Sequence, residues 1–63
     1  MSNLDSAKTE IEAAQKELRG AFYCLEEGEI TAAEQALYSA REHAEDAYQA
    51  VRRYCEAWEQ GQF

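Results

Sequence analysis

The 63-residue sequence contains no proline, and its three glycines stand apart from one another. No helix is therefore broken by proline, and no glycine-rich phosphate-binding loop is present. Basic side chains are scarce as well, because 13 acidic residues against 6 basic ones leave a formal net charge of −7. Such a charge repels nucleic acid phosphates and anionic membranes, and it favours solubility or a basic partner.

Long apolar runs are also missing from the sequence. No stretch approaches the ~20 consecutive apolar residues of a membrane span. The start, Met-Ser-Asn-Leu-Asp, lacks the basic and apolar regions of a signal peptide. The sequence therefore predicts a cytoplasmic protein that does not associate with a membrane.

Residues that carry chemistry are few, and His43 is the only imidazole. Glu17, Glu42 and Asp46 offer carboxylates, but residue 40 is alanine, so the Glu-x-x-His spacing of di-metal bundles is absent. We interpret His43 as a hydrogen-bonded residue at the edge of the core, level with Glu17. A metal ligand and a pH switch that meets its own copy in a dimer remain alternatives. We expect no enzyme activity, no cofactor and no metal.

The two cysteines do not form a disulfide framework. In a hairpin that turns at Gly28, Cys24 lies near the turn and Cys55 near the open end. At ~1.5 Å per residue they are ~30 Å apart, beyond the reach of a disulfide. We expect free thiols; a bridge between the subunits of an antiparallel dimer is the alternative.

The sequence does have a seven-residue repeat in both halves. Apolar side chains alternate at spacings of three and four, the pattern of a helix that keeps one face against partner helices. In the first half, large residues alternate with alanines, which let helices approach closely. The predicted core and dimer residues are Leu4, Ala7, Ile11, Ala14, Leu18, Ala21, Leu25, Ile30, Ala33, Leu37, Ala40, Ala44, Ala47, Tyr48, Val51, Tyr54 and Trp58.

Local signals place two helices at about residues 3–27 and 31–60. Gly28 can take the left-handed conformation that closes a helix, and Thr31 with Glu34 has the spacing of a capping box. A turn this short forces the two helices antiparallel. The sequence thus predicts one all-α helical-hairpin domain over residues 1–63.

A lone hairpin of this size is expected to leave one side of its apolar stripe in water, because two helices form only two walls of a core. Self-association removes that exposure by turning two hairpins into a four-helix bundle. We therefore predict a homodimer.

The surface signal of the sequence is aromatic. Tyr23 and Tyr38 fall on outward positions of the repeat, with Phe22 beside Tyr23 and Arg19 level with Tyr38. Tyrosine and arginine are favoured in protein interfaces. Arg19, Phe22, Tyr23 and Tyr38 are thus the candidate residues for binding another protein. The alternative is that these rings lie flat over neighbouring side-chain stems.

The segments His-Ala-Glu-Asp-Ala-Tyr at 43–48 and Glu-Gln-Ala at 34–36 resemble the Rop family. Members of that family are plasmid-encoded RNA-binding proteins that form antiparallel four-helix bundles from two hairpins. The resemblance implies the bundle. At the positions where that family contacts RNA, this sequence has different residues: Ser2, Thr9, Ala13, Glu17 and Cys24.

The chain is also similar in style to small acidic helical-hairpin proteins from the early regions of lambdoid phages, which tune regulation. We expect a non-enzymatic homodimeric module for protein–protein interaction, a small phage- or plasmid-borne regulator that acts on a host or phage protein. Two alternatives remain open: Rop-like RNA binding, and mimicry of nucleic acid by carboxylates that occupy a basic site on a host protein.

Overall fold

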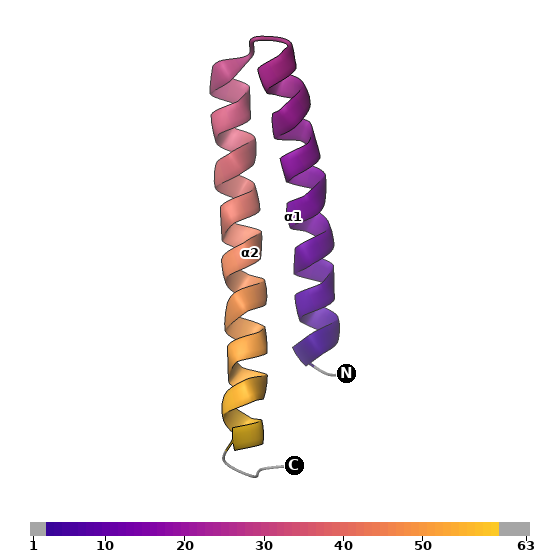
Figure 1. Ribbon diagram of the computed structural model, residues 1–63, viewed down its shortest axis with the longest axis vertical. Helices are drawn as coiled ribbons and strands as arrows, with labels where there is room; N and C mark the ends of the chain where they lie inside the picture. Colours follow the sequence, from indigo (N-terminus) through magenta and orange to yellow (C-terminus); the bar gives the residue numbers. More distant parts are fainter. Residues whose placement is uncertain (1–2, 60–63) are drawn as a thin grey trace.

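The computed structural model describes residues 3–59 and consists of two helices lying side by side (Figure 1). Helix α1 spans Asn3–Glu26 and helix α2 spans Ile30–Glu59. The predicted all-α antiparallel hairpin is confirmed, and the two helix ends at the turn, Glu26 and Ile30, lie within one residue of their predicted positions. The predicted end of the second helix, at residue 60, lies outside the described residues. The side chain of Trp58, one of the predicted core residues, lies outside the described part of the structure.

The hairpin is a rod of 50 × 16 × 12 Å. The two helices lie side by side in a single layer (Figure 1). Within residues 3–59, neither helix combines the length and the apolar character that a membrane crossing requires.

The turn between the helices depends on Gly28, whose φ is +77°. The amide of Glu29 donates to the carbonyl of Cys24 over 2.8 Å, and the amide of Gly28 donates to the carbonyl of Leu25 over 3.2 Å. These two bonds form a Schellman motif, which satisfies carbonyls that the end of a helix leaves without partners. The predicted left-handed glycine is therefore confirmed.

Helix α2 begins one residue earlier than the capping box predicts. The carbonyl of Glu29 accepts the amide of Ala33 over 3.0 Å, so Glu29 occupies the N-cap position. Thr31 lies inside the first turn of α2, and its predicted role as the cap is wrong. The reason is the turn itself, because Gly28 reverses the chain so sharply that Glu29 alone separates it from α2.

Two glycine-to-alanine substitutions should change stability in opposite directions. A Cβ added at Gly20 or at Gly28 meets no atom within 4 Å, so packing does not distinguish the two sites. Gly20→Ala, inside α1, should raise the free energy of unfolding by up to ~1 kcal/mol. Gly28→Ala should lower it by ~1–2 kcal/mol, because alanine disfavours positive φ. Urea denaturation checks both, and equal midpoints for the two variants would contradict the turn geometry.

The contact between the helices is an alanine seam. In the described part of the chain, the buried residues are all alanines, spaced seven residues apart within each helix: Ala7, Ala14, Ala21, Ala33, Ala40 and Ala47. Small side chains at this spacing let two antiparallel helices approach closely along their length. The hairpin thus closes without burying any of its large apolar side chains.

Candidate interaction surface

The large apolar residues of the repeat lie beside the seam and face solvent. We call this surface the apolar face; it comprises Leu4, Ile11, Leu18, Leu25, Ile30, Leu37, Ala44, Tyr48 and Val51. Leu4 is half-buried and Ala44 is exposed, while the other seven side chains are 39–64% exposed. Soluble monomers rarely leave a contiguous apolar patch of this kind uncovered.

These residues share one side of the hairpin because of their spacing. Leu18 follows the buried Ala14 by four residues, and Val51 follows the buried Ala47 by four. Four residues turn a helix about 40° beyond a full turn, so both rows are displaced to one side of the seam. In antiparallel helices the two displacements fall on the same side, and both helices therefore contribute to one surface.

A shallow hollow lies on the apolar face where residues of both helices converge. Three of its lining residues are the alanines Ala14, Ala44 and Ala47. Its remaining lining is larger: Ile11, Gln15, Leu18, Tyr48 and Val51. The hollow exists because Ala44 occupies a position where the preceding and following repeats of α2 carry Leu37 and Val51.

Tyr48 is held at the edge of the apolar face by Arg52. The Arg52 guanidinium donates to the Tyr48 hydroxyl over 3.3 Å and pairs with Glu56 over 3.2 Å. The hydrogen bond to Tyr48, with the nearby Glu56 carboxylate, raises the pKa of Arg52 above its usual value. Arg52 stays charged, and it lies one helical turn beyond Tyr48 on α2.

The predicted core residues thus fall into two groups. The first group is the six alanines that are buried in the seam, beside which Tyr54 is half-buried. The second group is the apolar face, whose members remain accessible to a further helix. The hairpin alone does not bring the two groups together into one core.

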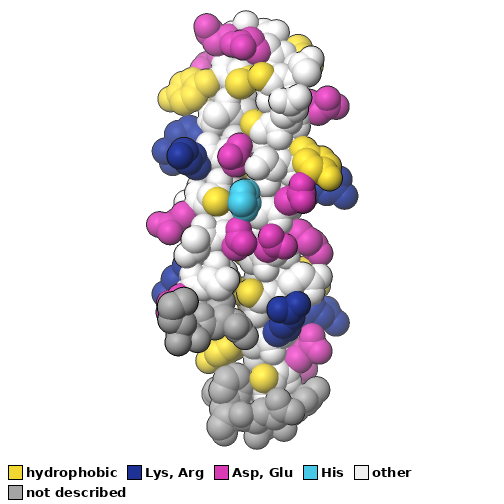
Figure 2. All heavy atoms as spheres, turned by 180° about the vertical axis from the view of Figure 1, so that it is seen from behind, with side chains coloured by type: hydrophobic (Ala, Val, Ile, Leu, Met, Phe, Trp, Pro, Cys, Tyr) yellow, Lys and Arg dark blue, Asp and Glu magenta, His cyan; other side chains and the backbone are white. Residues whose placement is uncertain are grey.

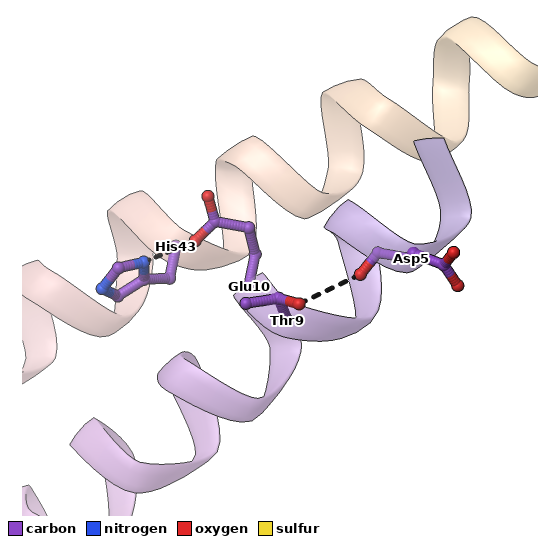
Figure 3. A network of polar contacts seen from close by, with 4 residues as sticks. All are labelled: Asp5, Thr9, Glu10 and His43. Carbon is purple, nitrogen blue, oxygen red and sulfur yellow. Dashed lines mark hydrogen bonds and ion pairs between the residues drawn. The ribbon is translucent and has the colours of Figure 1, made fainter. Parts of the chain in front are cut away.

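The opposite face of the hairpin carries a polar contact between the helices. His43 Nδ1 lies 2.7 Å from Glu10 Oε1, and both side chains are about one-third exposed (Figure 3). Nearby, the Thr9 hydroxyl donates to the Asp5 carbonyl over 3.1 Å. Figure 2 shows the imidazole near the centre of this face with acidic side chains around it.

The partner of His43 is Glu10 and not Glu17, which the sequence placed at its level. Both glutamates occupy the same position of the seven-residue repeat, one repeat apart. Counting residues from the turn could not decide which glutamate contacts His43, because the count places His43 at a level between Glu10 and Glu17. Within the described residues, no group of three or more histidine, cysteine, aspartate or glutamate side chains is arranged to hold a metal ion.

Removal of both partners should reveal a coupling between Glu10 and His43. In a double-mutant cycle with Glu10→Ala and His43→Ala, we expect a coupling free energy of ~0.2–1 kcal/mol, as for other partly exposed ion pairs. Glu17→Ala with His43→Ala is the matched control and should show no measurable coupling. Urea denaturation of the wild type, the three single variants and the two double variants at constant pH provides the measurement. Equal coupling for both glutamates would contradict the contact.

The candidate aromatic residues lie on two separate outer flanks. Tyr23 follows the buried Ala21 by two residues, and Tyr38 precedes the buried Ala40 by two. Two residues turn a helix by about 200°, so each tyrosine points away from the other helix. Figure 2 shows large hydrophobic side chains projecting from both edges of the hairpin. The structure therefore does not join Tyr23 and Tyr38 into one patch.

The two flanks differ in chemistry. On α1, Phe22 and Tyr23 meet edge to face, with ring centroids 5.9 Å apart, and a shallow groove there is also lined by Gln15, Leu18 and Arg19. On α2, the groove at Tyr38 is lined by one arginine and three carboxylates: Arg41, Glu42, Glu45 and Asp46. The rings of Phe22, Tyr23 and Tyr38 are about 60% exposed. The α1 flank is aromatic and basic, and the α2 flank is acidic.

Both cysteines are free, with Cys24 half-buried and Cys55 exposed.

Comparison of the chain with protein-family models, with curated proteins and with solved structures finds no match.

Proposed function

We propose that this protein is a non-enzymatic homodimeric module for protein–protein interaction. The observation that carries the proposal is the apolar face, whose large side chains are 39–64% exposed although they follow the repeat of a helix core. Full burial of such a side chain contributes ~1.5–3 kcal/mol, so covering the exposed half of each contributes about 1 kcal/mol. Several residues of this kind on one face make association favourable.

A second copy is the partner that fits this face best. The hairpin extends 50 Å along its axis, so a face that runs along it has room for an interface to which each partner contributes roughly 800 Å². Two such hairpins placed face to face complete a four-helix bundle with the large residues in its centre. The same surface is used on both copies, as a two-fold dimer requires.

The outer flanks provide the surface for a further protein. Tyr23 and Tyr38 point away from the seam, and each remains accessible when the apolar face is covered. Exposed tyrosines with a neighbouring arginine, as at Arg19, have the composition of binding hot spots. The carboxylates at Tyr38 favour a basic partner through electrostatic steering. From the resemblance to the Rop family and the similarity in style to phage hairpin proteins, we extend the proposal to a small phage- or plasmid-borne regulator acting on a host or phage protein.

Replacing both tyrosines should separate binding from folding. Because neither ring contributes to the seam or to the apolar face, Tyr23→Ser with Tyr38→Ser should leave the melting temperature almost unchanged. The same pair of changes should weaken capture of a protein from bacterial lysate more than tenfold, since buried tyrosine anchors often contribute ~2 kcal/mol or more each. Gln35→Ser with Gln49→Ser, two exposed changes on α2, is the matched control.

Each other outcome has a defined meaning. A large drop in melting temperature would show that the tyrosines are structural. Unchanged stability with unchanged capture would contradict the assignment of the binding surface to these flanks. Capture of RNA in place of protein would support the Rop-like alternative, and its salt dependence would identify phosphate contacts.

A further inference from the structure

The apolar face is built from four successive layers. The contact between Glu10 and His43 places the residues that follow them, Ile11 and Ala44, at the same level of the two helices. The seven-residue repeat then defines the other levels on either side. From the open end to the turn, the layers are Leu4 with Val51, Ile11 with Ala44, Leu18 with Leu37, and Leu25 with Ile30.

The second and third layers differ in the size of their side chains. Ala44 is the only small residue among the four layers, and it lines the hollow on the face. The third layer has leucine on both helices, and Leu18 and Leu37 are each about half exposed. The face therefore has one depression and one ridge, displaced to opposite sides of its midpoint.

Two copies can meet through this face in two orientations. With the turns at opposite ends, the second layer of each copy meets the third layer of the other, so Leu37 lies over the hollow at Ala44. With the turns at the same end, each α1 lies over the other copy's α2 and every layer meets itself, so one central layer holds two alanines with two isoleucines and the next holds four leucines. Protein interiors tolerate neither voids nor overpacking well, so shape favours opposite ends.

We propose that two copies associate antiparallel through the apolar face, with the turns at opposite ends and each Leu37 seated over the hollow at Ala44 of the other copy. This inference rests on the proposed homodimer and adds its orientation and register. The second copy is the occupant because its face supplies both a ridge that fits this hollow and a hollow that accepts this ridge.

A distance between spin labels on the two turns tests this orientation. The label is attached at Glu27→Cys in a chain that also carries Cys24→Ser and Cys55→Ser, and dipolar coupling is measured between the two copies. Turns at opposite ends should give a distance of ~40 Å, because about 25 residues at 1.5 Å each separate the two levels. A distance under ~20 Å, about two interhelical spacings, would overturn the orientation while leaving the homodimer intact. Absence of coupling at micromolar concentration would overturn the homodimer as well.

An exchange of ridge and hollow tests the register independently. Leu37→Ala and Ala44→Leu should each weaken dimerisation about tenfold or more, since one opens a void and the other removes the hollow. The double variant should recover most of this loss, because leucine at 44 then lies over alanine at 37 of the other copy. In the same-end orientation residues 37 and 44 never meet across the dimer. Additive losses in the double variant would therefore overturn the proposed register.

Discussion

Leu18→Ala is expected to lower the free energy of unfolding by ~2–5 kcal/mol, although half of the Leu18 side chain is exposed in the hairpin. The reason is that, in the proposed dimer, the second copy covers Leu18 in one of the two central layers. In an isolated hairpin the same change would remove a side chain that is only partly buried, and the loss would be much smaller. Urea denaturation at two protein concentrations measures the effect, and the midpoint should depend on concentration.

Tyr38→Ala is the matched control for Leu18. It removes a larger side chain that is 61% exposed but lies on the outer flank of α2, away from the apolar face. We expect its effect to remain within ~0.5 kcal/mol, as for most surface substitutions. A loss for Leu18→Ala no larger than the loss for Tyr38→Ala would contradict the burial of Leu18 in a dimer.

Ala14→Leu is the second substitution with a large expected effect. Ala14 is only 8% exposed and belongs to the alanine seam, so leucine at this position must force the two helices apart. Overpacking of this kind costs ~1–3 kcal/mol. For a domain of this size, a loss of 2 kcal/mol corresponds to a drop in melting temperature of roughly 10 °C.

Ala32→Leu is the control for the seam. Ala32 lies in the first turn of α2 and is exposed, so leucine adds the same atoms without entering the helix contact. Its melting temperature should be almost unchanged, because alanine and leucine have similar helix propensities. A rise in melting temperature for Ala14→Leu would show that the seam is not closely packed.

The helices and their turn were predictable from the sequence because their determinants are local. The spacing of apolar residues set the helix period, and Gly28 between two uninterrupted repeats marked the turn. The start of α2 was less accurate, because Thr31 has the residue type of a cap but the Schellman turn makes Glu29 the cap. Signals from residue type alone do not resolve a boundary that the preceding turn fixes.

The division of the apolar stripe between seam and face was not predictable in the same way. The sequence groups Ala14 and Leu18 in one stripe, since a 3-4 spacing places both near one side of a helix. The structure separates them, because one neighbouring helix covers only the alanine row. Which row the hairpin buries depends on how closely the two helices approach, and that is a property of the pair.

The candidate site could be predicted only in part. The outward positions of Tyr23 and Tyr38 followed from the repeat, but their placement on opposite flanks required both helices together. The contact of His43 with Glu10 required the interhelical register, which residue counting gives only to within about one repeat. The hollow at Ala44 had a signal in the sequence, as the one alanine among larger residues at its position in the repeat, but its meaning depends on the facing layer.

Sedimentation equilibrium of the wild-type chain tests the homodimer most directly. We expect a species of twice the 7.2 kDa chain mass at micromolar concentration, with a melting temperature that rises with protein concentration. A species of 7.2 kDa throughout this range, with melting independent of concentration, would contradict the homodimer. In that case the apolar face would remain uncovered by a second copy.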